Sequence, residues 1–302
     1  MAGIDCGTNS IRLLIADLDA EGRLHDLVRR MEVVRLGEGV DQTGRLSEAA
    51  LERTRAALAD YTAQIRELGA EAIRMVATSA SRDAANATEF SAMVASVLGQ
   101  APEVISGDEE ARLSFTGAAA TLPELDGQRL LVDIGGGSTE FVRGTAGEVL
   151  AAISVDVGCV RMTERHLRSD PPRQSELDAA VADITAVADK ALKVADSGRE
   201  ASELVAVAGT ATTIAAIALG LKAYDPDAID GTRLTYAEVA EVAADLAAAD
   251  HASRLAIPVM HPGRADVIVG GALVLRTIME RSGIESVLIS EHDILDGIAL
   301  SA

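Results

Sequence analysis

Cysteine is scarce in this 302-residue chain, which contains only Cys6 and Cys159. Two cysteines without a Cys-x-x-Cys pair exclude a disulfide framework and argue against a structural zinc site. A free, reduced thiol is the normal state of cysteine in a reducing compartment. The sequence therefore predicts a chain that neither disulfides nor zinc hold together, and we expect Cys159 to pack as a small apolar residue.

Long hydrophobic runs are also missing. No apolar stretch reaches the ~18 residues that a membrane-spanning helix needs. The first residues, MAGIDCGTNS, have neither a basic region nor the apolar core of a secretory signal. We expect a cytoplasmic protein with no membrane partner.

Positive charge is in deficit, with 27 Lys and Arg against 47 Asp and Glu and a net charge of -20. Such a field opposes non-specific binding to nucleic acid, so we expect no nucleic-acid partner. It also opposes any polyanionic substrate. Arginines, helix N-termini and a divalent cation would have to reverse the potential locally at a site for such a substrate.

The chain repeats a short pattern. Asp-x-Gly-x-x-Ser occurs at Asp5 to Ser10 and again at Asp133 to Ser138, 128 residues later, each time after a strand-like run. A second echo, with nearly the same offset, relates IRMVAT (73–78) to LVAVAG (204–209). The length fits two domains. We predict a duplicated α/β unit with an N-terminal domain at 1–122 and a C-terminal domain at 123–302, joined near the linker TLPELDGQ (121–128).

Each half is predicted to hold antiparallel hairpins followed by parallel strand–helix units, which gives a mixed sheet with helices on its faces. In the first half we expect strands near 2–6, 11–18, 25–35 and 72–78, and helices near 47–68 and 86–98. In the second half we expect strands near 129–134, 139–144, 148–155 and 204–208, and helices near 159–167, 175–195, 211–219, 235–248 and 264–281.

The repeated loops have the chemistry of phosphate binding. Glycines permit tight turns and let backbone N–H groups approach an anion closely. An aspartate at a strand end can hold a hydrated divalent cation that bridges phosphate oxygens. The candidate donors are Thr8, Asn9 and Ser10 in the first loop and Gly135, Gly136, Gly137 and Ser138 in the second, and the candidate metal ligands are Asp133 and Asp5. We expect the two loops to face each other across an inter-domain cleft.

A third anion site is predicted at Gly209 and Thr210, where a buried strand opens into a helix. A simple threonine-rich helix cap remains the alternative there. Arg161, Arg165 and Arg168 would share one face of a continuous helix and could follow a chain of phosphates, although a solvated helix face is an equal alternative.

Seven segments together resemble the exopolyphosphatase/guanosine pentaphosphate phosphohydrolase (Ppx/GppA) phosphatases in order and spacing. They are GIDCGTNSIRLL (3–14), ATSASRDAANATEF (77–90), VISGDEEARLSFTG (104–117), LVDIGGGSTEFV (131–142), VGCVRMTERH (157–166), AGTATTIAA (208–216) and RADVIVGGALVL (264–275). The resemblance implies two ribonuclease H-like domains of the actin, sugar-kinase and heat-shock-ATPase superfamily. Its length resembles the short, two-domain form of the family.

The resemblance also implies roles for particular residues. Glu110, the second glutamate of SGDEEARL, falls on the catalytic glutamate of the family, and Arg82 falls on an arginine near the phosphate. An ion pair with a nearby acid is the alternative for Arg82. Relatives act with Mg²⁺ or Mn²⁺ and are often homodimers.

One segment departs from the family pattern. Relatives usually read Ser-x-x-Gly-Leu-Arg-Glu-Gly, whereas this chain reads SEHDILDG (290–297). Asp293, Leu295 and Asp296 stand at the glycine, arginine and glutamate positions. Any contact that relatives make there is therefore in doubt.

Three functions remain open at this point. The first is hydrolysis of the terminal phosphoanhydride of inorganic polyphosphate by an activated water, which the short form and the arginine face favour. The second is the same chemistry on guanosine pentaphosphate. The third is a regulatory protein that binds a nucleotide or alarmone and has weak catalysis, which the altered segment 290–297 keeps open.

Overall fold

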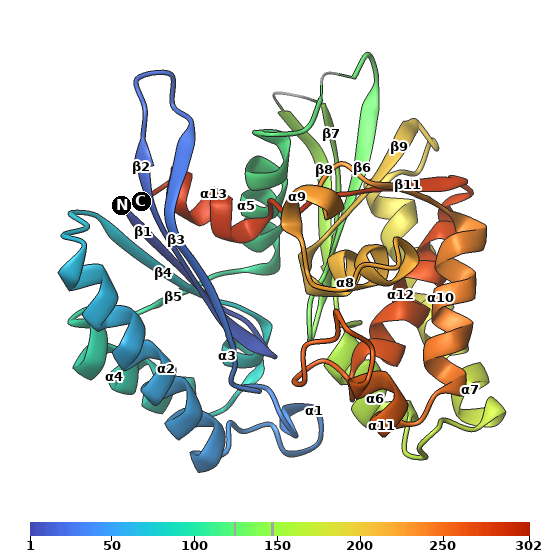
Figure 1. Cartoon of the computed structure of the whole chain (residues 1–302), viewed down its shortest axis with the longest axis horizontal. Helices are drawn as coiled ribbons and strands as arrows, with labels where there is room; N and C mark the ends of the chain where they lie inside the picture. The colour runs from blue at the N-terminus through green and yellow to red at the C-terminus, as the bar shows by residue number, and fades with distance from the viewer. Residues whose placement is uncertain (124, 146–147) are drawn as a thin grey trace. The chain divides into compact units, whose positions relative to one another are not determined.

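The computed structural model describes residues 1–123, 125–145 and 148–302, so Glu124 of the predicted linker lies outside the described residues. The chain divides into two compact units, Met1–Ala120 with Asp293–Ala302, and Thr121–His292 (Figure 1). None of the helices in the described ranges combines the length and hydropathy needed to cross a membrane.

The first unit is built on a five-stranded sheet in the order β3-β2-β1-β4-β5. The strands β1 to β3 pair antiparallel, whereas β4 and β5 run parallel to β1. The strands are β1 (Ala2–Cys6), β2 (Ser10–Leu18), β3 (Leu24–Val33), β4 (Ile73–Ala77) and β5 (Glu103–Val104), and the helices are α1 (Val40–Thr43), α2 (Glu48–Glu67), α3 (Ser79–Asp83), α4 (Ala87–Leu98), α5 (Gly107–Ala119) and α13 (Ile294–Leu300).

The two faces of this sheet bury different side chains, as the period-2 alternation of a strand requires. Ile11, Leu13 and Ile15 of β2 pack in the core that includes α2 and α4. Leu14 and Ala16 point to the other face and pack against α13. Figure 1 shows α2 and α4 on one side of the sheet and α5 and α13 on the other.

Helix starts follow the expected capping chemistry. The Ser47 side chain accepts a hydrogen bond from Ala50 N at the start of α2, which confirms the predicted helix there. Ser106 does the same for α5 by accepting from Glu109 N. Helix α5 was not among the predicted helices, and its first turn carries Glu110.

The second unit repeats the plan, with strand order β10-β11-β9-β6-β7-β8. β6 to β8 pair antiparallel, and β9 and β11 run parallel to β6. This repetition confirms the predicted duplication of a ribonuclease H-like α/β unit. The strands are β6 (Gln128–Ile134), β7 (Thr139–Thr145), β8 (Glu148–Val155), β9 (Ala201–Val207), β10 (Arg233–Thr235) and β11 (Ser286–Ile289), and the helices are α6 (Cys159–His166), α7 (Gln174–Ala195), α8 (Ala208–Ala218), α9 (Pro226–Ile229), α10 (Tyr236–Ala248), α11 (His251–Leu255) and α12 (Ile268–Ser282).

The C-terminal segment differs from the domain boundaries expected from the sequence. The first boundary falls at Ala120/Thr121, close to the expected one, but Asp293–Ala302 returns to the first unit. There α13 crosses α5 at two glycines. A Cβ on Gly297 would lie 2.0 Å from Leu113 O, and a Cβ on Gly117 would lie 1.9 Å from Asp293 O. The backbones of the two helices therefore touch, and only glycine permits that approach.

Replacing Gly297 with alanine should lower the stability of the first unit by about 3 kcal/mol, because the added methyl group meets a carbonyl oxygen instead of a mobile side chain. Gly198→Ala is the control, since the atoms nearest to its Cβ belong to the flexible Glu200 side chain, and it should cost under about 1 kcal/mol. Thermal unfolding of both variants measures the difference. Equal midpoints would contradict the close packing of α13 on α5.

Candidate functional site

The first loop joins β1 to β2 at the carboxyl end of β1. Gly7 N donates to Ser10 O at 3.0 Å, which closes the turn. Within the described residues, the buried Oγ1 of Thr8 and Oδ1 of Asn9 have no hydrogen-bond partner, and neither do Ser79 Oγ and Ser81 Oγ in α3, which directly follows β4. Buried polar atoms normally have partners. Several orphaned oxygen atoms around the ends of adjacent parallel strands point to a ligand or ordered water there.

Asp5, a predicted metal ligand, is engaged by an arginine. Arg12 Nε and Nη2 donate to Asp5 Oδ2 at 2.9 and 2.7 Å, and Arg12 Nη1 donates to Asp293 Oδ2. Burial raises the pKa of the Asp5 carboxyl above its ordinary value, and the charge and hydrogen bonds of Arg12 oppose that shift. Burial would lower the pKa of Arg12, but the charges of Asp293 and Asp5 outweigh it and raise that pKa.

Glu110 and Arg82, the two predicted catalytic residues, meet in the first unit. Glu110 lies in the first turn of α5 and is 7% exposed. Arg82, at the end of α3, donates through Nη1 to Glu110 Oε2 at 3.0 Å and to Ile105 O at 2.9 Å. The adjacent Glu109 is 46% exposed in its side chain and pairs with Arg74. The structure thus separates a buried, oriented glutamate from its solvent-facing neighbour.

The second loop has the same turn as the first. Gly135 N donates to Ser138 O at 3.0 Å, as Gly7 N does to Ser10 O. The carbonyls of Gly135 and Gly136 accept from the first N–H groups of α6, and Arg161 Nε donates to Gly137 O at 2.7 Å. A Cβ on Gly158 would lie 2.4 Å from Gly136 O. The start of α6 therefore packs directly against the loop and fixes its shape.

A second acid, Glu140, lies beside Asp133. The register of β6 and β7 places the two residues opposite each other, and Ser154 of β8 donates to Glu140 Oε1 at 2.7 Å. Asp133 is 5% exposed and Glu140 only 1%. Two buried carboxylates at neighbouring positions are a donor set that suits a hard divalent cation. Our reading of the sequence missed Glu140, although it follows Asp133 by the same seven residues as Arg12 follows Asp5.

The part of the chain that the structure describes contains no complete protein cage for a metal. No three His, Cys, Asp or Glu side chains converge on a cation site within residues 1–123, 125–145 and 148–302. Mg²⁺ commonly binds through one or two carboxylates and completes its shell with water and substrate phosphates. Asp133 and Glu140 fit that requirement. Asp5 fits it less well because Arg12 already neutralises its carboxylate.

Gly209 and Thr210 lie in the first turn of α8, which begins three residues earlier than predicted. Ala208 has φ +70°, a left-handed conformation that costs a residue with a Cβ about 1–2 kcal/mol. A Cβ on Gly209 would lie 2.1 Å from Arg264 Nη2, and Arg264 Nη1 donates to Thr213 Oγ1 at 3.0 Å. Arg264, which our reading of the sequence did not single out, therefore crosses the helix start at the predicted third anion site.

The continuous helix that would place Arg161, Arg165 and Arg168 on one face does not form. α6 ends at His166, one residue from the predicted end, and its C-cap Leu167 leaves the helical conformation (φ -99°, ψ 89°), so Arg168 lies outside the helix. Arg165 Nη1 pairs with Asp183 at 2.9 Å, whereas Arg161 is bound to the second loop. Arg161 and Arg165, four residues apart, both lie on α6 and share a face of that helix, whereas Arg168 lies beyond its end.

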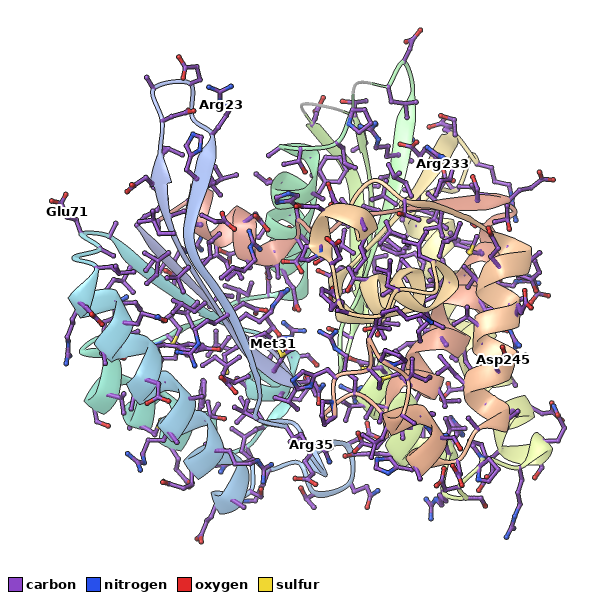
Figure 2. The ribbon with its side chains drawn as sticks, in the orientation of Figure 1. Arg23, Met31, Arg35, Glu71, Arg233 and Asp245 are labelled. Carbon is purple, nitrogen blue, oxygen red and sulfur yellow. The ribbon has the colours of Figure 1, made fainter. Side chains whose placement is uncertain are left out.

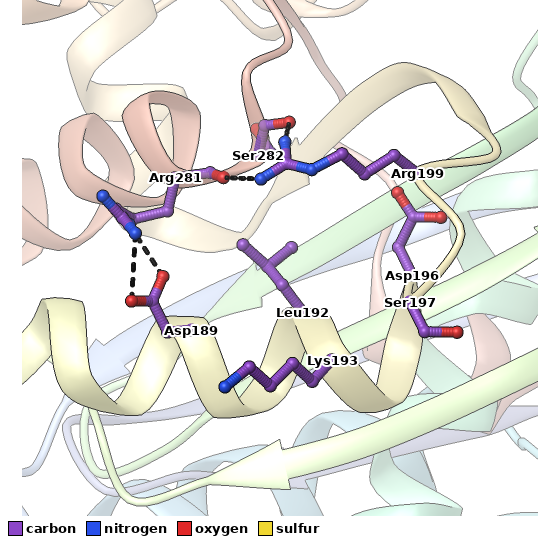
Figure 3. Close-up of a pocket in the computed structure, with 8 residues that line it drawn as sticks. All are labelled: Asp189, Leu192, Lys193, Asp196, Ser197, Arg199, Arg281 and Ser282. Atoms are coloured by element: carbon purple, nitrogen blue, oxygen red, sulfur yellow. Dashed lines mark hydrogen bonds and ion pairs between the residues drawn. The ribbon is translucent and has the colours of Figure 1, made fainter.

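A cavity of about 360 Å³ lies at the C-terminal ends of α7 and α12 and has none of the predicted site residues in its lining (Figure 3). Its two arginines have structural partners. Arg199 donates to Ser282 O at 2.6 Å and to Arg281 O at 3.2 Å, and Arg281 pairs with both carboxylate oxygens of Asp189. Cations are expected at helix C-termini, where carbonyl groups lack partners. The cavity therefore reflects capping of α12.

Neither cysteine should act as a nucleophile. Burial raises the pKa of Cys159 to about 11, against the smaller opposing effects of a Thr210 hydrogen bond and the charge of Arg264. Burial also raises the pKa of Cys6. At pH 8 we expect a thiol-specific disulfide reagent to leave the native protein unmodified over minutes, because thiolate is the reactive form. The denatured protein, as the control, should titrate both thiols at once, and rapid modification of the native form would contradict this prediction.

Comparison with known proteins gives close relatives over the whole chain. Exopolyphosphatase 2 of Mycobacterium tuberculosis is 49% identical over 313 residues, which cover 100% of this chain and 98% of the relative. A crystal structure described as an exopolyphosphatase-like protein is 43% identical, has a TM-score of 0.95, and is matched over 99% of this chain and 96% of its own.

A solved structure with lower sequence identity points to the same family. The Aquifex aeolicus member of the Ppx/GppA family is 32% identical with a TM-score of 0.82, over 99% of this chain and 96% of its own. The sequence pattern of the Ppx/GppA phosphatase family matches residues 14–302 of this chain. The family predicted from the seven segments is confirmed, and the chain belongs to the Ppx/GppA phosphatase family.

Proposed function

We propose that this protein is an exopolyphosphatase, which hydrolyses the terminal phosphoanhydride of inorganic polyphosphate with an activated water. The ion pair between the buried Glu110 and the partly exposed Arg82, which directly follows Ser81 with its orphaned hydroxyl oxygen, carries the proposal. The close similarity to a protein named Exopolyphosphatase 2 supports the choice of substrate.

Glu110 is the proposed general base. A base must be held within hydrogen-bonding reach of the water it deprotonates, and it must be a carboxylate when it acts. Its place in the first turn of α5 favours the negative charge through the helix dipole. Arg82 holds one carboxylate oxygen, Oε2. We propose that Arg82 orients Glu110 and adds positive charge near the transferred phosphoryl group.

The loops supply donors to phosphate oxygens. We propose that Thr8, Asn9 and Ser10 in the first unit, and Gly135 through Ser138 with Gly209 and Thr210 in the second, bind phosphate. Asp133 and Glu140 would hold Mg²⁺ or Mn²⁺. The metal, when bound, neutralises phosphate oxygens and stabilises the leaving group. Each of these roles follows from the position of the residue within its own unit.

Replacing Glu110 with glutamine should reduce turnover of polyphosphate by about 10²-fold or more, the usual scale for a positioned base. Glutamine keeps the size and one acceptor oxygen, so the fold should survive. Glu109→Gln is the matched control because it removes the same charge one residue away at an exposed position, and its rate should stay within about twofold. Phosphate released in the presence of Mg²⁺ measures both.

The same assay separates the other functions. Short polyphosphate, long polyphosphate and guanosine pentaphosphate are compared at equal concentration of phosphoanhydride ends. Preference for the guanosine nucleotide would replace the proposed substrate with the second one. Tight nucleotide binding without turnover in the wild type would favour a regulatory protein. An unchanged rate in Glu110→Gln would remove that residue from the mechanism.

Removing metal should abolish turnover, and Mg²⁺ should restore it. Asp133→Asn and Glu140→Gln should each raise the Mg²⁺ concentration at half-maximal rate about tenfold or more, because each removes a charged oxygen ligand. Glutamine at 140 can still accept the Ser154 hydrogen bond. Glu148→Gln, on an exposed position of β8, is the control. If neither variant shifts the Mg²⁺ dependence, the cation binds elsewhere.

The homodimer and the cytoplasmic location expected from the sequence stay predictions.

A further inference from the structure

Arg12 is shared between two buried carboxylates of the first unit. It makes two hydrogen bonds to Asp5 Oδ2 and one to Asp293 Oδ2. The side chains of Asp5, Arg12 and Asp293 are 7%, 18% and 3% exposed. Buried ions bind each other strongly, and removing one partner leaves an uncompensated charge. Replacing any one of the three side chains would therefore leave a buried charge on another without its partner.

The packing of α13 explains why this group is buried. Arg12 lies on β2 between Ile11 and Leu13, so its side chain points to the opposite face, where Leu14 packs against α13. Asp293 is the N-cap of that helix and accepts from Leu295 N through its other oxygen, Oδ1. One carboxylate thus fixes both the start of α13 and the Arg12 guanidinium.

The second unit has the opposite charge at the same position of the repeat. Arg12 pairs in register with Asp5, and Glu140 pairs in register with Asp133. On the next strand, β3, Met31 pairs in register with Arg12 and is labelled in Figure 2. In the second unit the corresponding residue on β8 is Ser154, which pairs in register with Glu140 and donates a hydrogen bond to it. The first loop thus contains its own cation, while the second loop has two acids.

We propose that Asp293 is a positioning residue of the first phosphate loop, which acts through Arg12 on Asp5. Arg12 supplies the positive charge that a metal would otherwise bring to Asp5, so on this proposal Asp5 is no cation ligand. Asp5 lies in β1, two residues before Gly7, where the turn with Thr8, Asn9 and Ser10 begins, and it acts on the loop through this stretch of backbone. This inference rests on the proposed function, since the loop is taken to bind phosphate, and it gives a role to the altered segment 290–297.

Asp296 provides a matched control on the same helix. It is also buried, it completes the capping box with Asp293, and it pairs with Arg29 Nη2 at 2.6 Å. Arg29 lies on β3 and pairs with Asp26 as well, away from the β1–β2 loop. Asparagine at either position keeps the size and the capping ability of aspartate. Asp293→Asn and Asp296→Asn therefore each remove one ion pair made by a buried carboxylate, but only Asp293 pairs with Arg12, the partner of Asp5.

The first test compares kcat and KM for polyphosphate at saturating Mg²⁺. For Asp293→Asn we expect kcat/KM to fall about tenfold or more, the scale seen when a residue that orients a ligand is lost. For Asp296→Asn we expect a change below about twofold, with a similar loss in unfolding temperature. If the two variants lose activity equally per folded molecule, Asp293 has only a structural role and the proposal is wrong.

The second test needs no catalysis. Mn²⁺ binding, followed by the loss of the free-ion electron paramagnetic resonance signal, is measured for the wild type, Asp5→Asn, Asp293→Asn and Asp133→Asn. We expect the Mn²⁺ dissociation constant to change less than about twofold in Asp5→Asn and Asp293→Asn. In Asp133→Asn it should rise about tenfold or more. Weakening in Asp5→Asn equal to that in Asp133→Asn would make Asp5 a cation ligand and overturn the proposal.

The two tests also distinguish the possible failures. A wild-type protein without phosphate release from polyphosphate would contradict the proposed function, whatever the Mn²⁺ data show. An active wild type in which Asp293→Asn behaves as Asp296→Asn does would contradict only the role of Asp293. Arg12→Lys adds a check, because lysine keeps the charge but lacks the planar fork that contacts both carboxylates. It should behave as Asp293→Asn does.

Discussion

A buried carboxylate needs a countercharge, and this requirement governs the charged residues at the strand ends of both units. An unpaired ion inside a protein is costly, so such a group is paired, hydrogen-bonded or bound to a metal. In the first unit arginines meet the requirement, with Arg12 on Asp5 and Arg82 on Glu110. In the second unit Asp133 faces another acid, Glu140. The register thus places a cation opposite the loop aspartate in the first unit and a second acid opposite it in the second unit.

Duplication explains how one scaffold came to serve both purposes. The turns closed by Gly7 and Gly135 have the same hydrogen bond, and the residue seven positions after each loop aspartate lies directly opposite it on the next strand. A hairpin register fixes which side chains meet, whatever their charge. A change from one charge to the other at that position alters the electrostatics of the loop without altering its backbone.

Local patterns predicted most of the sheet and the loops, because hairpins and glycine turns are determined by neighbouring residues. The strands at 2–6 and 129–134 and the helix that starts after Ser47 follow from alternation and capping. Helices α5 and α13 were missed because Gly117 and Gly297 lower helix propensity, and the close contact between the two helices offsets that cost. The pairing of Arg12 with Asp293 spans 281 residues, and no local pattern reports such a contact.

The arginines near the loops are bound to the protein itself, which bears on how a chain with a net charge of -20 accepts a polyanion. Arg12 donates to two aspartates, Arg82 to Glu110 and a carbonyl, and Arg161 to Gly137 O. Arg12 and Arg82 thus share their positive charge with carboxylates of the protein, whereas the carbonyl that binds Arg161 is neutral. On the proposed function, backbone N–H groups and a divalent cation held by Asp133 and Glu140 would neutralise the incoming phosphates. On this view the cation does more than assist the chemical step, because without it the net field of the protein would oppose binding itself.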